Sequence, residues 1–293
     1  MRRLALWSTT TLLAALSLSS CINQPPPEAV TLKVAAADNF EPVLKQLAQA
    51  YSDRQPWIKV ELHTANTAKL EDDLKNGVAY DLYIPARTES LIALAQKDGI
   101  NPQSHAVLAL NQLVVVAPAD SDLRLDYESL TSSSVRQIAV ANPNLLLGYL
   151  TRQSLSSLHY LPSHEAKPLA AADTTPAPAP TTSALGLPDL SPQATAVEIN
   201  LEPKLLVVAS DAEVLAAVED GRAQIGITYA SYADADKKIH VLSPLPLQTY
   251  QNVTYNAAIP RNAPHNDEAW HFLDYLRSAE AHSIMQSNGL LVN

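Results

Sequence analysis

The stretch that decides the fold is "VAAADNFEPVLKQLAQAY", residues 34–51. Its small apolar half predicts a buried strand, and Val43, Leu47 and Tyr51 then recur at the spacing of one helix face. The two predicted elements meet at Asp38. A helix that starts directly after a strand presents free N–H groups, which bind anions. A carboxylate at this junction therefore needs an explanation.

Strands and helices alternate through most of the chain. On the amino-terminal side, strands are predicted at Thr31–Ala37, Ile58–Ala65 and Tyr80–Ala86, with helical segments between them. The stretch "KLLVVASDAEVLAAVEDGRAQIGITYASYA" (204–233) repeats the order strand, helix, strand. This alternation predicts an α/β protein in which parallel strands are joined by right-handed crossovers.

Composition and motifs argue against several classes of function. The 293 residues carry a formal net charge of -10, which disfavours a nucleic-acid partner. The 7 glycines form neither of the common nucleotide-binding loops, and the chain contains no H-E-x-x-H and no G-x-S-x-G. The single cysteine allows no intrachain disulfide and no cysteine-cluster zinc site. We therefore expect no enzyme activity, no cofactor and no bound metal.

The first 20 residues are predicted to be a signal peptide. Arg2 and Arg3 precede an apolar stretch that is short and interrupted by Ser and Thr, unlike a membrane span. The segment "LSSC" (18–21) resembles the bacterial lipobox, which predicts cleavage before Cys21 and lipidation of its thiol. An ordinary signal peptide that happens to contain this cysteine is the alternative. Residues 21–30 include three consecutive prolines and are predicted to form a stiff tether.

A change of composition marks an insertion at about residues 163–196. Its sequence includes "AADTTPAPAPTTSALGLPDLSPQATA" (171–196), which is rich in Ala, Pro, Thr and Ser. Because this segment has few large apolar side chains, it cannot form a packed core. We therefore expect the insertion to be disordered or only loosely packed on the surface.

Five stretches stand in an order that is found in a known family. They are "VAAADNFEPVLKQLA" (34–48), "YDLYIPARTESL" (80–91), "NQLVVVAPA" (111–119), "VEDGRAQIGITYASYA" (218–233) and "AWHFLDYLRSAEAHSIMQSNGLLV" (269–292). Together they resemble the periplasmic molybdate-binding proteins of ABC importers, within the type II solute-binding protein superfamily. The resemblance implies two Rossmann-like α/β lobes with mixed sheets, joined by two crossing strands near residues 113–117 and 253–257.

The resemblance also implies domain boundaries. Lobe I would comprise residues 31–112 plus 256–293. Lobe II would comprise residues 113–255 and would carry the insertion. The ligand would lie in the cleft between the lobes and would be captured by a hinge motion that closes them.

Finally, the resemblance implies a ligand site. The family holds a tetrahedral oxyanion with neutral donors, which are hydroxyls and backbone N–H groups at helix starts. Matched position by position, the ligand-binding residues would be Asp38, Thr67, Gly148, Asp211 and Tyr229. Thr67 and Tyr229 keep a hydroxyl, but a helix cap and a half-buried core tyrosine are their alternative roles. Asp38 departs from the family, which has a hydroxyl residue there.

Three explanations of Asp38 stay open. It can be an N-cap, with Glu41 completing a capping-box-like pattern. It can accept a hydrogen bond from a protonated oxyanion, or it can hold a cationic ligand together with Asp211. Two like charges at about 4 Å and an effective dielectric of about 20 repel by roughly 4 kcal/mol, which disfavours a dianion beside both carboxylates. Arg87 either neutralises Asp38 across the cleft or is a solvated surface residue.

These inferences predict an exported, lipid-anchored and monomeric solute-binding protein on the periplasmic side of the cell envelope. It would bind an oxyanion of the molybdate/tungstate type and deliver it to an ABC permease. The alternative is a sensor or scaffold of the envelope that kept the fold but takes no part in transport. Whether the anchor lies in the inner or the outer membrane stays open.

Overall fold

The computed structural model describes residues 28–124, 126–162, 200–233 and 236–292. The predicted signal peptide, Cys21, most of the tether and the insertion therefore lie outside the described residues. Within the described part of the chain, no helix is long and apolar enough to cross a membrane.

The first sheet has three parallel strands in the order β2-β1-β3. Its strands are β1 (Val30–Ala37), β2 (Ile58–Ala65) and β3 (Leu82–Ile84). Each strand is followed by a helix, and these are α1 (Glu41–Arg54), α2 (Thr67–Lys75) and α3 (Thr88–Gln96). A helix after each strand carries the chain back to the start of the next one, as parallel pairing requires. The predicted β-α-β order of this half is confirmed.

The second sheet is mixed and has five strands in the order β7-β6-β8-β5-β9. Its strands are β5 (Leu113–Pro118), β6 (Ile138–Ala141), β7 (Leu205–Val208), β8 (Ile225–Tyr229) and β9 (Ile239–Pro244). Strand β6 pairs in parallel with β7 and β8, whereas β5 pairs antiparallel with β8 and β9. The helices of this half are α4 (Leu146–Ser157), α5 (Asp211–Glu219) and α6 (Ala230–Ala233).

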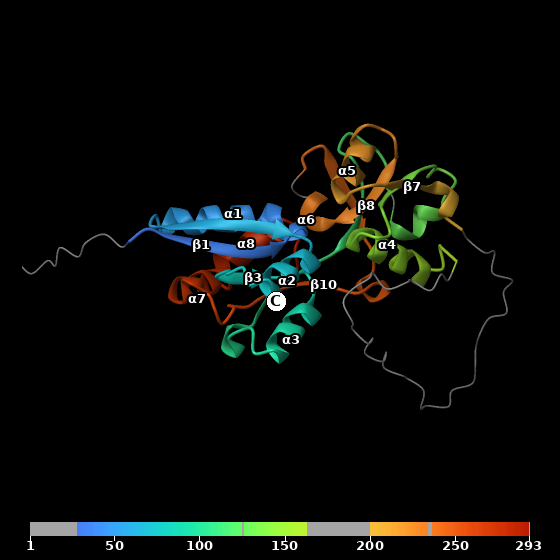
Figure 1. Ribbon diagram of the computed structural model, residues 1–293. Coiled ribbons are helices and arrows are strands. Elements are labelled where there is room, and N and C mark those ends of the chain that lie inside the picture. Colours follow the sequence, from blue (N-terminus) through green and yellow to red (C-terminus); the bar gives the residue numbers. More distant parts are fainter. Residues whose placement is uncertain (1–27, 125, 163–199, 234–235, 293) are drawn as a thin grey trace, which may run out of the picture.

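A two-stranded antiparallel ribbon connects the two halves. It pairs β4 (Ala106–Asn111) with β10 (Val253–Ala257). The predicted crossing strand at 253–257 is therefore β10, but its partner is β4 and not the segment at 113–117. That segment is β5, inside the five-stranded sheet, where its uniformly buried apolar residues fit an interior strand. Figure 1 shows β10 running between the two groups of elements.

The carboxyl-terminal helices return to the first half. They are α7 (Asn266–Leu276) and α8 (Ala279–Ser287). Tyr51 of α1 packs against the rings of Phe272 and Tyr275, with centroid distances of 4.8 and 5.2 Å. Leu291 then pairs with Leu110 of β4, so the chain ends beside the ribbon. The described residues also contain five short 3-10 helices: η1 (Asp38–Phe40), η2 (Pro102–Ser104), η3 (Tyr127–Thr131), η4 (Glu202–Lys204) and η5 (Leu247–Thr249).

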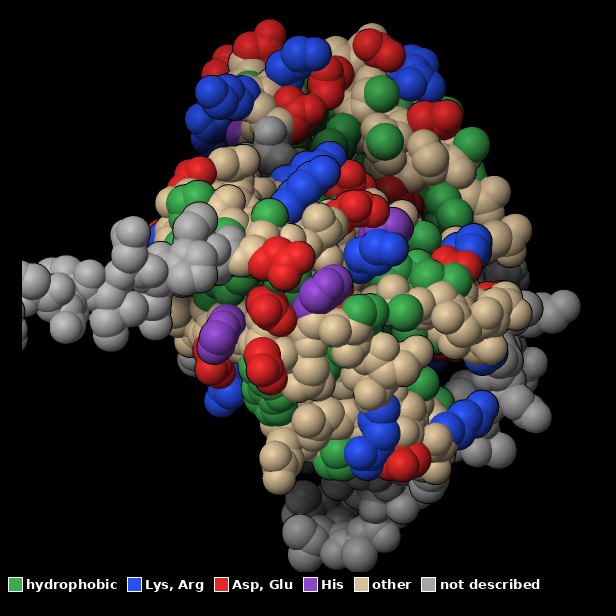
Figure 2. Space-filling view, turned by 60° about the vertical axis from the view of Figure 1, so that its left-hand side comes forward, with side chains coloured by type: hydrophobic (Ala, Val, Ile, Leu, Met, Phe, Trp, Pro, Cys, Tyr) green, Lys and Arg blue, Asp and Glu red, His purple; other side chains and the backbone are tan. Residues whose placement is uncertain are grey.

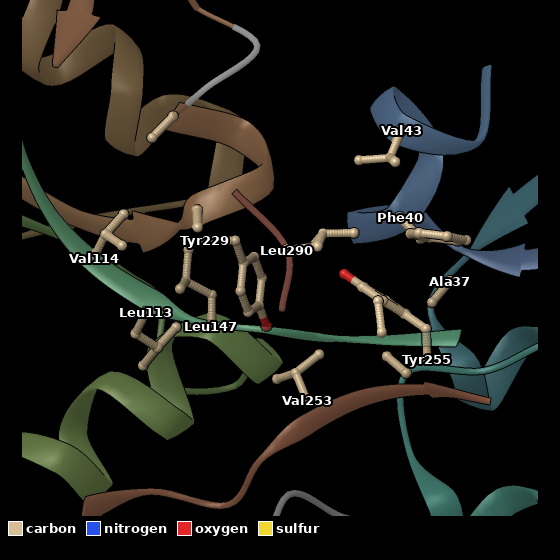
Figure 3. Packing of buried hydrophobic residues seen from close by; sticks show 14 of the residues in the cluster. Ala37, Phe40, Val43, Leu113, Val114, Leu147, Tyr229, Val253, Tyr255 and Leu290 are labelled. Carbon is tan, nitrogen blue, oxygen red and sulfur yellow. The ribbon is translucent and has the colours of Figure 1, made fainter. Parts of the chain in front are cut away.

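One apolar cluster runs through both halves and past the ribbon. Figure 3 shows its middle part, where Tyr229 lies among side chains of the second half and Tyr255 lies beside Phe40 of the first. The rings of Phe40 and Tyr255 are stacked, with centroids 4.3 Å apart. Because this stacking joins η1 to β10, the end of β1 is held close to the point where the two halves meet.

Candidate ligand-binding site

The carboxyl ends of β1 and β2 lie side by side in the first half. Ala37 pairs with Ala65 in the parallel register. Asp38 follows the first strand and Asn66 and Thr67 follow the second, so both helix starts lie at one edge of the sheet. In open α/β sheets, ligands bind beyond this carboxyl edge, where helix N–H groups point outward.

The second half presents a matching edge. Ala141 pairs with Val208, so the helices α4 and α5 begin beside each other after β6 and β7. Tyr229 ends β8, and β8 pairs in parallel with β6 in the same sheet. Of the residues predicted for this half, Gly148 lies in α4, Asp211 opens α5, and Tyr229 lies at the end of its strand.

Asp38 is the first residue of η1, and its carboxylate is bound locally. Its Oδ1 accepts a hydrogen bond of 2.8 Å from the N–H of Asn39. The capping-box interpretation is wrong, because Glu41 accepts from the Thr64 hydroxyl at 2.8 Å and pairs with Lys45 at 2.6 Å instead. Part of Asp38 is open to solvent, yet the protein around its carboxylate removes water and raises its pKa, and Glu41 adds to this rise.

Asp211 opens α5 but does not cap it. Ser210 is the cap, since its hydroxyl accepts from the N–H of Glu213 at 3.3 Å, and Glu213 accepts from the N–H of Ala209 at 3.0 Å. The Asp211 carboxyl group is half-buried, and its Oδ1 has no hydrogen-bond partner among the described residues. Burial and then the charge of Asp38 raise the pKa of Asp211 to about 7.

Asp38 and Asp211, which we call the acidic pair, thus act on each other across the two halves. Repulsion between like charges is mutual, so it belongs to the pair and not to one residue. Asp211 is the more enclosed of the two, and near neutral pH it is the residue that takes up the proton. The amino end of α5 favours the ionised form of Asp211, so burial and Asp38 outweigh this helix effect.

Two tyrosine hydroxyls lie close to the acidic pair. Tyr229 is 0% exposed, and its hydroxyl makes no hydrogen bond of good geometry among the described residues, although the side chain of Asn39 lies near enough to act on it. Burial and then Asp211 raise the pKa of Tyr229 well above its usual value. Burial, Asp38 and Asp211 likewise raise the pKa of Tyr232, whose ring meets that of Tyr229 edge-on at 5.8 Å. Both hydroxyls therefore stay protonated at physiological pH and are available as donors.

A connected set of buried hydrogen bonds begins at the backbone of Asn39, the residue directly after Asp38. The carbonyl oxygen of Asn39 accepts from the hydroxyls of Tyr255 (3.0 Å) and Ser231 (3.1 Å). The amide of Asn111 donates to both hydroxyls at 2.8 Å. These four residues, which we call the inter-sheet network, link η1, β4, α6 and β10. The sequence reasoning missed them, although a polar Asn111 at the end of an apolar strand was a visible signal.

Thr67 and Gly148 have specific local settings. Thr67 is half-buried, and Asn66 caps its helix by accepting from the N–H of Lys69 at 2.9 Å, so the cap interpretation of Thr67 is wrong. Gly148 is needed for packing, because an added Cβ would lie 2.2 Å from the carbonyl oxygen of Asn142. Helix α4 starts without a side-chain cap, which leaves its first N–H groups unblocked by side chains.

In the described part of the chain, few other charged or metal-binding groups lie near the site. Arg87 lies 3.8 Å from Glu89, and it is not among the groups that shift the pKa of Asp38. No group of three His, Cys, Asp or Glu residues that could hold a metal was found among the described residues. A hollow lined by Ser121, Arg124 and His240, among others, opens beyond Pro118, at the opposite end of β5 from Tyr229.

The face of the molecule seen in Figure 2 is mixed in charge. Figure 2 shows acidic and basic side chains interspersed over one face, with acidic side chains also in the recess between the upper and lower parts. The arrangement as a whole combines neutral donors and helix starts, which suit an anion, with two carboxylates, which do not.

Comparisons with known proteins agree with this description. The model of the family described as "Bacterial extracellular solute-binding protein" matches residues 32–291. The molybdate-binding protein ModA of Escherichia coli is 25% identical over 286 residues, covering 95% of each chain. A putative ABC transporter substrate-binding lipoprotein of Bacillus subtilis, YvgL, is 21% identical, covering 89% of this chain and 86% of the relative.

A solved structure has the same fold. The substrate-binding domain of a putative molybdenum ABC transporter from Clostridium difficile superposes with a TM-score of 0.68 at 21% identity, covering 89% of this chain and 97% of that one. The predicted fold class is thereby confirmed, and the relatives are named as binding proteins, not as enzymes. The chain belongs to the family of bacterial extracellular solute-binding proteins.

Proposed function

We propose that this chain is the solute-binding lipoprotein of an ABC importer for an oxyanion. It would be anchored on the periplasmic side of the cell envelope through a lipid on Cys21. It would act as a monomer and deliver its solute to an ABC permease. Family membership supports extracellular solute binding, and the names of the relatives support both the importer and the oxyanion class. The lobe boundaries at residues 112/113 and 255/256 are part of this proposal.

The single observation that carries the oxyanion class is the meeting of helix starts from two sheets. The starts of η1 and α2 belong to one half, and those of α4 and α5 belong to the other. The effect of Asp38 on the pKa of Asp211 supports their facing each other across one cleft. Helix starts present N–H groups and positive dipole ends, and hydroxyls such as those of Thr67 and Tyr229 add neutral donors.

Closure of the cleft fits the way the two halves are connected. The chain passes between them at the ribbon of β4 and β10, where few residues need to change their backbone angles. The inter-sheet network lies at the same place and holds η1 against β10 and α6. A ligand that bridges the two edges would therefore stabilise the closed form by adding contacts to both halves at once.

A thermal-shift screen tests the function. The purified chain is mixed with molybdate, tungstate, sulfate, phosphate or a divalent cation. An anion at about 100 times its Kd should stabilise the fold by about 2.7 kcal/mol, a Tm increase of roughly 5 °C or more. Stabilisation by a divalent cation and by none of the anions would contradict the oxyanion class.

Two variants make this screen specific for the site. Tyr229→Phe removes a buried hydroxyl at the end of β8, and Tyr275→Phe removes a buried hydroxyl in α7. The first should reduce the anion-induced shift by at least about half, since a lost hydrogen bond to a charged group weakens binding by about 1.5–3 kcal/mol. The second should leave the shift unchanged. If the two variants change the anion-induced shift by the same amount, the anion does not bind beside Tyr229.

The lipid anchor is tested separately. The full-length chain, expressed in a bacterial host, should partition into the detergent phase, and Cys21→Ser should move it into the aqueous phase because the thiol that carries the lipid is gone. Phase partition of the native chain that Cys21→Ser leaves unchanged would contradict lipidation at this residue.

A further inference from the structure

The hydrogen bonds of the inter-sheet network differ in the parts of the molecule that they join. Asn111 of β4 and Tyr255 of β10 belong to the ribbon, where the chain passes between the halves. Asn39 belongs to η1 of the first half, and Ser231 belongs to α6 of the second. The bond of 3.1 Å from the Ser231 hydroxyl to the Asn39 carbonyl oxygen is therefore the one in this network that joins the two halves directly.

Helix α6 is fixed to the second half. It follows β8 directly and contacts β5, β8 and β9 of the five-stranded sheet. Its first residue, Ala230, also donates its N–H to the carbonyl oxygen of Gln112, just before β5, at 2.9 Å. A rotation of the second half about the ribbon would therefore carry the Ser231 hydroxyl along with α6.

The carbonyl oxygen of Asn39 is held from the ribbon as well. It accepts from the Tyr255 hydroxyl at 3.0 Å, and the next residue, Phe40, stacks on the Tyr255 ring (Figure 3). A carbonyl oxygen has two lone pairs, so it can accept from Tyr255 and Ser231 together. If the second half rotates away from η1, the donor on the ribbon remains in place, whereas Ser231 loses its acceptor.

Burial distinguishes this bond from another hydrogen bond near the ribbon. Ser231 is 0% exposed and Asn39 is 2% exposed. By contrast, Gln251, two residues before β10, donates from its side-chain amide to Glu89 of α3 at 3.2 Å, and this bond is exposed. Water can replace an exposed bond when it opens, but a buried donor that loses its acceptor is costly until water reaches it.

We propose that the Ser231 hydroxyl is the latch of the closed form, bonded to the Asn39 carbonyl oxygen when the halves meet and released from it when they part. Ser231 is then a positioning residue, because it aligns η1 against α6 without needing to touch the solute. The inference rests on the cleft closure of the proposed function, but it does not depend on which solute is bound. Asn39 directly follows Asp38, so the latch adjoins the helix start that would receive the solute.

The expected size of the effect follows from the loss of one hydrogen bond between neutral groups. Such a loss changes an equilibrium by roughly 2- to 12-fold. Ser231→Ala should therefore lower the ratio of closed to open chains by this factor. Binding of an anion that requires the closed form should weaken by at most the same factor, because its apparent affinity scales with the closed fraction.

Double electron–electron resonance measures the two forms directly. Spin labels are attached at Asp72→Cys in α2 and at Asp220→Cys after α5, which are exposed positions in different halves, in a chain that carries Cys21→Ser. The population whose label separation matches this structure is counted as closed. Spectra are recorded without an anion and with molybdate, so the closed fraction is known in both conditions.

Three variants assign the effect to the latch. Ser231→Ala should shift the labels out of the closed population, and Ser231→Thr, which keeps the hydroxyl, should restore it. Ser154→Ala is the matched control, because Ser154 is also 0% exposed and its hydroxyl bonds to that of Thr249 at 2.7 Å inside the second half. It should lower the Tm but leave the closed fraction unchanged. Thermal unfolding verifies that each variant is folded; Ser231→Ala should fold, since Tyr255 still bonds to both Asn39 and Asn111.

The latch and the proposed function can fail separately. A closed fraction that Ser231→Ala leaves unchanged would overturn the inference, whether or not molybdate binds. Equal shifts in Ser231→Ala and Ser154→Ala would also overturn it, because general destabilisation would then explain both. A shift in Ser231→Ala alone, in a chain that binds none of the anions of the thermal-shift screen, would support the latch and count against the oxyanion class.

Discussion

The acidic pair and the inter-sheet network meet at two consecutive residues, Asp38 and Asn39, yet they differ in how their polar groups are satisfied. In the network, the hydroxyls of Ser231 and Tyr255 both donate to Asn39 and both accept from Asn111. Beside the acidic pair, Asp211 Oδ1 is enclosed without a partner among the described residues, and the Tyr229 hydroxyl has only the side chain of Asn39 near it, at poor hydrogen-bond geometry. A bonded buried group holds a fold together, whereas an unpaired one destabilises it until a ligand supplies the partner.

The difference predicts opposite consequences of substitution in the two regions. Changes in the inter-sheet network should lower the stability of the fold with little direct effect on ligand contacts. Changes at the acidic pair should leave or improve stability and alter binding. The predictions below test this contrast, beginning with the largest expected effect.

Asn111→Ala should have the largest effect on stability. It removes the amide that both hydroxyls accept from, and it leaves a small void where the buried side chain was. The free energy of unfolding should fall by about 4 kcal/mol, measured by urea denaturation. Asn144→Ala, at an exposed position after β6, is the control and should change it by less than about 0.5 kcal/mol. A loss below about 1 kcal/mol in Asn111→Ala would show that the network does not stabilise the fold.

Asp211→Asn should have the next largest effect and the opposite sign. The native fold holds the Asp211 proton up to a pKa of about 7, whereas the ordinary value is 3.8. Between these values the folded state binds more protons, so the unfolding free energy falls as pH rises from about 4 to 7 and then levels off.

The full rise of the Asp211 pKa from 3.8 to about 7 corresponds to about 4 kcal/mol, and partial exposure of Asp211 reduces this value. Removing the group should therefore stabilise the chain at pH 8 by roughly 2–3 kcal/mol and leave its stability at pH 4 nearly unchanged. Urea denaturation of the native chain and the variant at both pH values measures the difference. A gain that is equal at the two pH values would mean that deprotonation of Asp211 is not its source.

Tyr255→Phe should lower stability by a moderate amount. It keeps the stacking on Phe40 and removes the hydroxyl that links Asn39 to Asn111. The expected loss is about 1.5 kcal/mol, because one good bond is lost on each side while Ser231 still bonds to both residues. Calorimetric Tm values of the native chain and the variant give this loss, and an unchanged Tm would remove Tyr255 from the network.

Tyr229→Phe makes the same chemical change and should have the smallest effect on stability. Its hydroxyl makes no hydrogen bond of good geometry among the described residues, so its removal should change the unfolding free energy by less than about 0.5 kcal/mol or raise it slightly. Urea denaturation beside Tyr255→Phe is the direct comparison of the two regions. A Tyr229→Phe loss as large as that of Tyr255→Phe would contradict the contrast between them.

Several parts of the fold could be predicted because their signals are local. The strand and helix within residues 34–51, and the α/β alternation on both sides of the ribbon, follow from periodicities of two and 3.6 residues. Other expectations failed where more than one local partner was available. In one of the three explanations of Asp38, Glu41 completes a cap, but Thr64 on the neighbouring strand and Lys45 one turn later bind it instead. The segment at 113–117 was expected to cross between lobes, but its apolar face suits the interior of a sheet.

The sequence by itself determined which residues stand at the strand ends and helix starts, including Asp38, Thr67 and Asp211, because caps and periodicity depend on neighbours within one turn. Only the tertiary structure decided that Asp38 and Asp211 act on each other, and that Asn39 meets Tyr255 from 216 residues away. Burial and electrostatic repulsion depend on distances in space, which no short stretch of sequence encodes. The role of Asp38 therefore depends on Asp211, which stands far from it in the sequence.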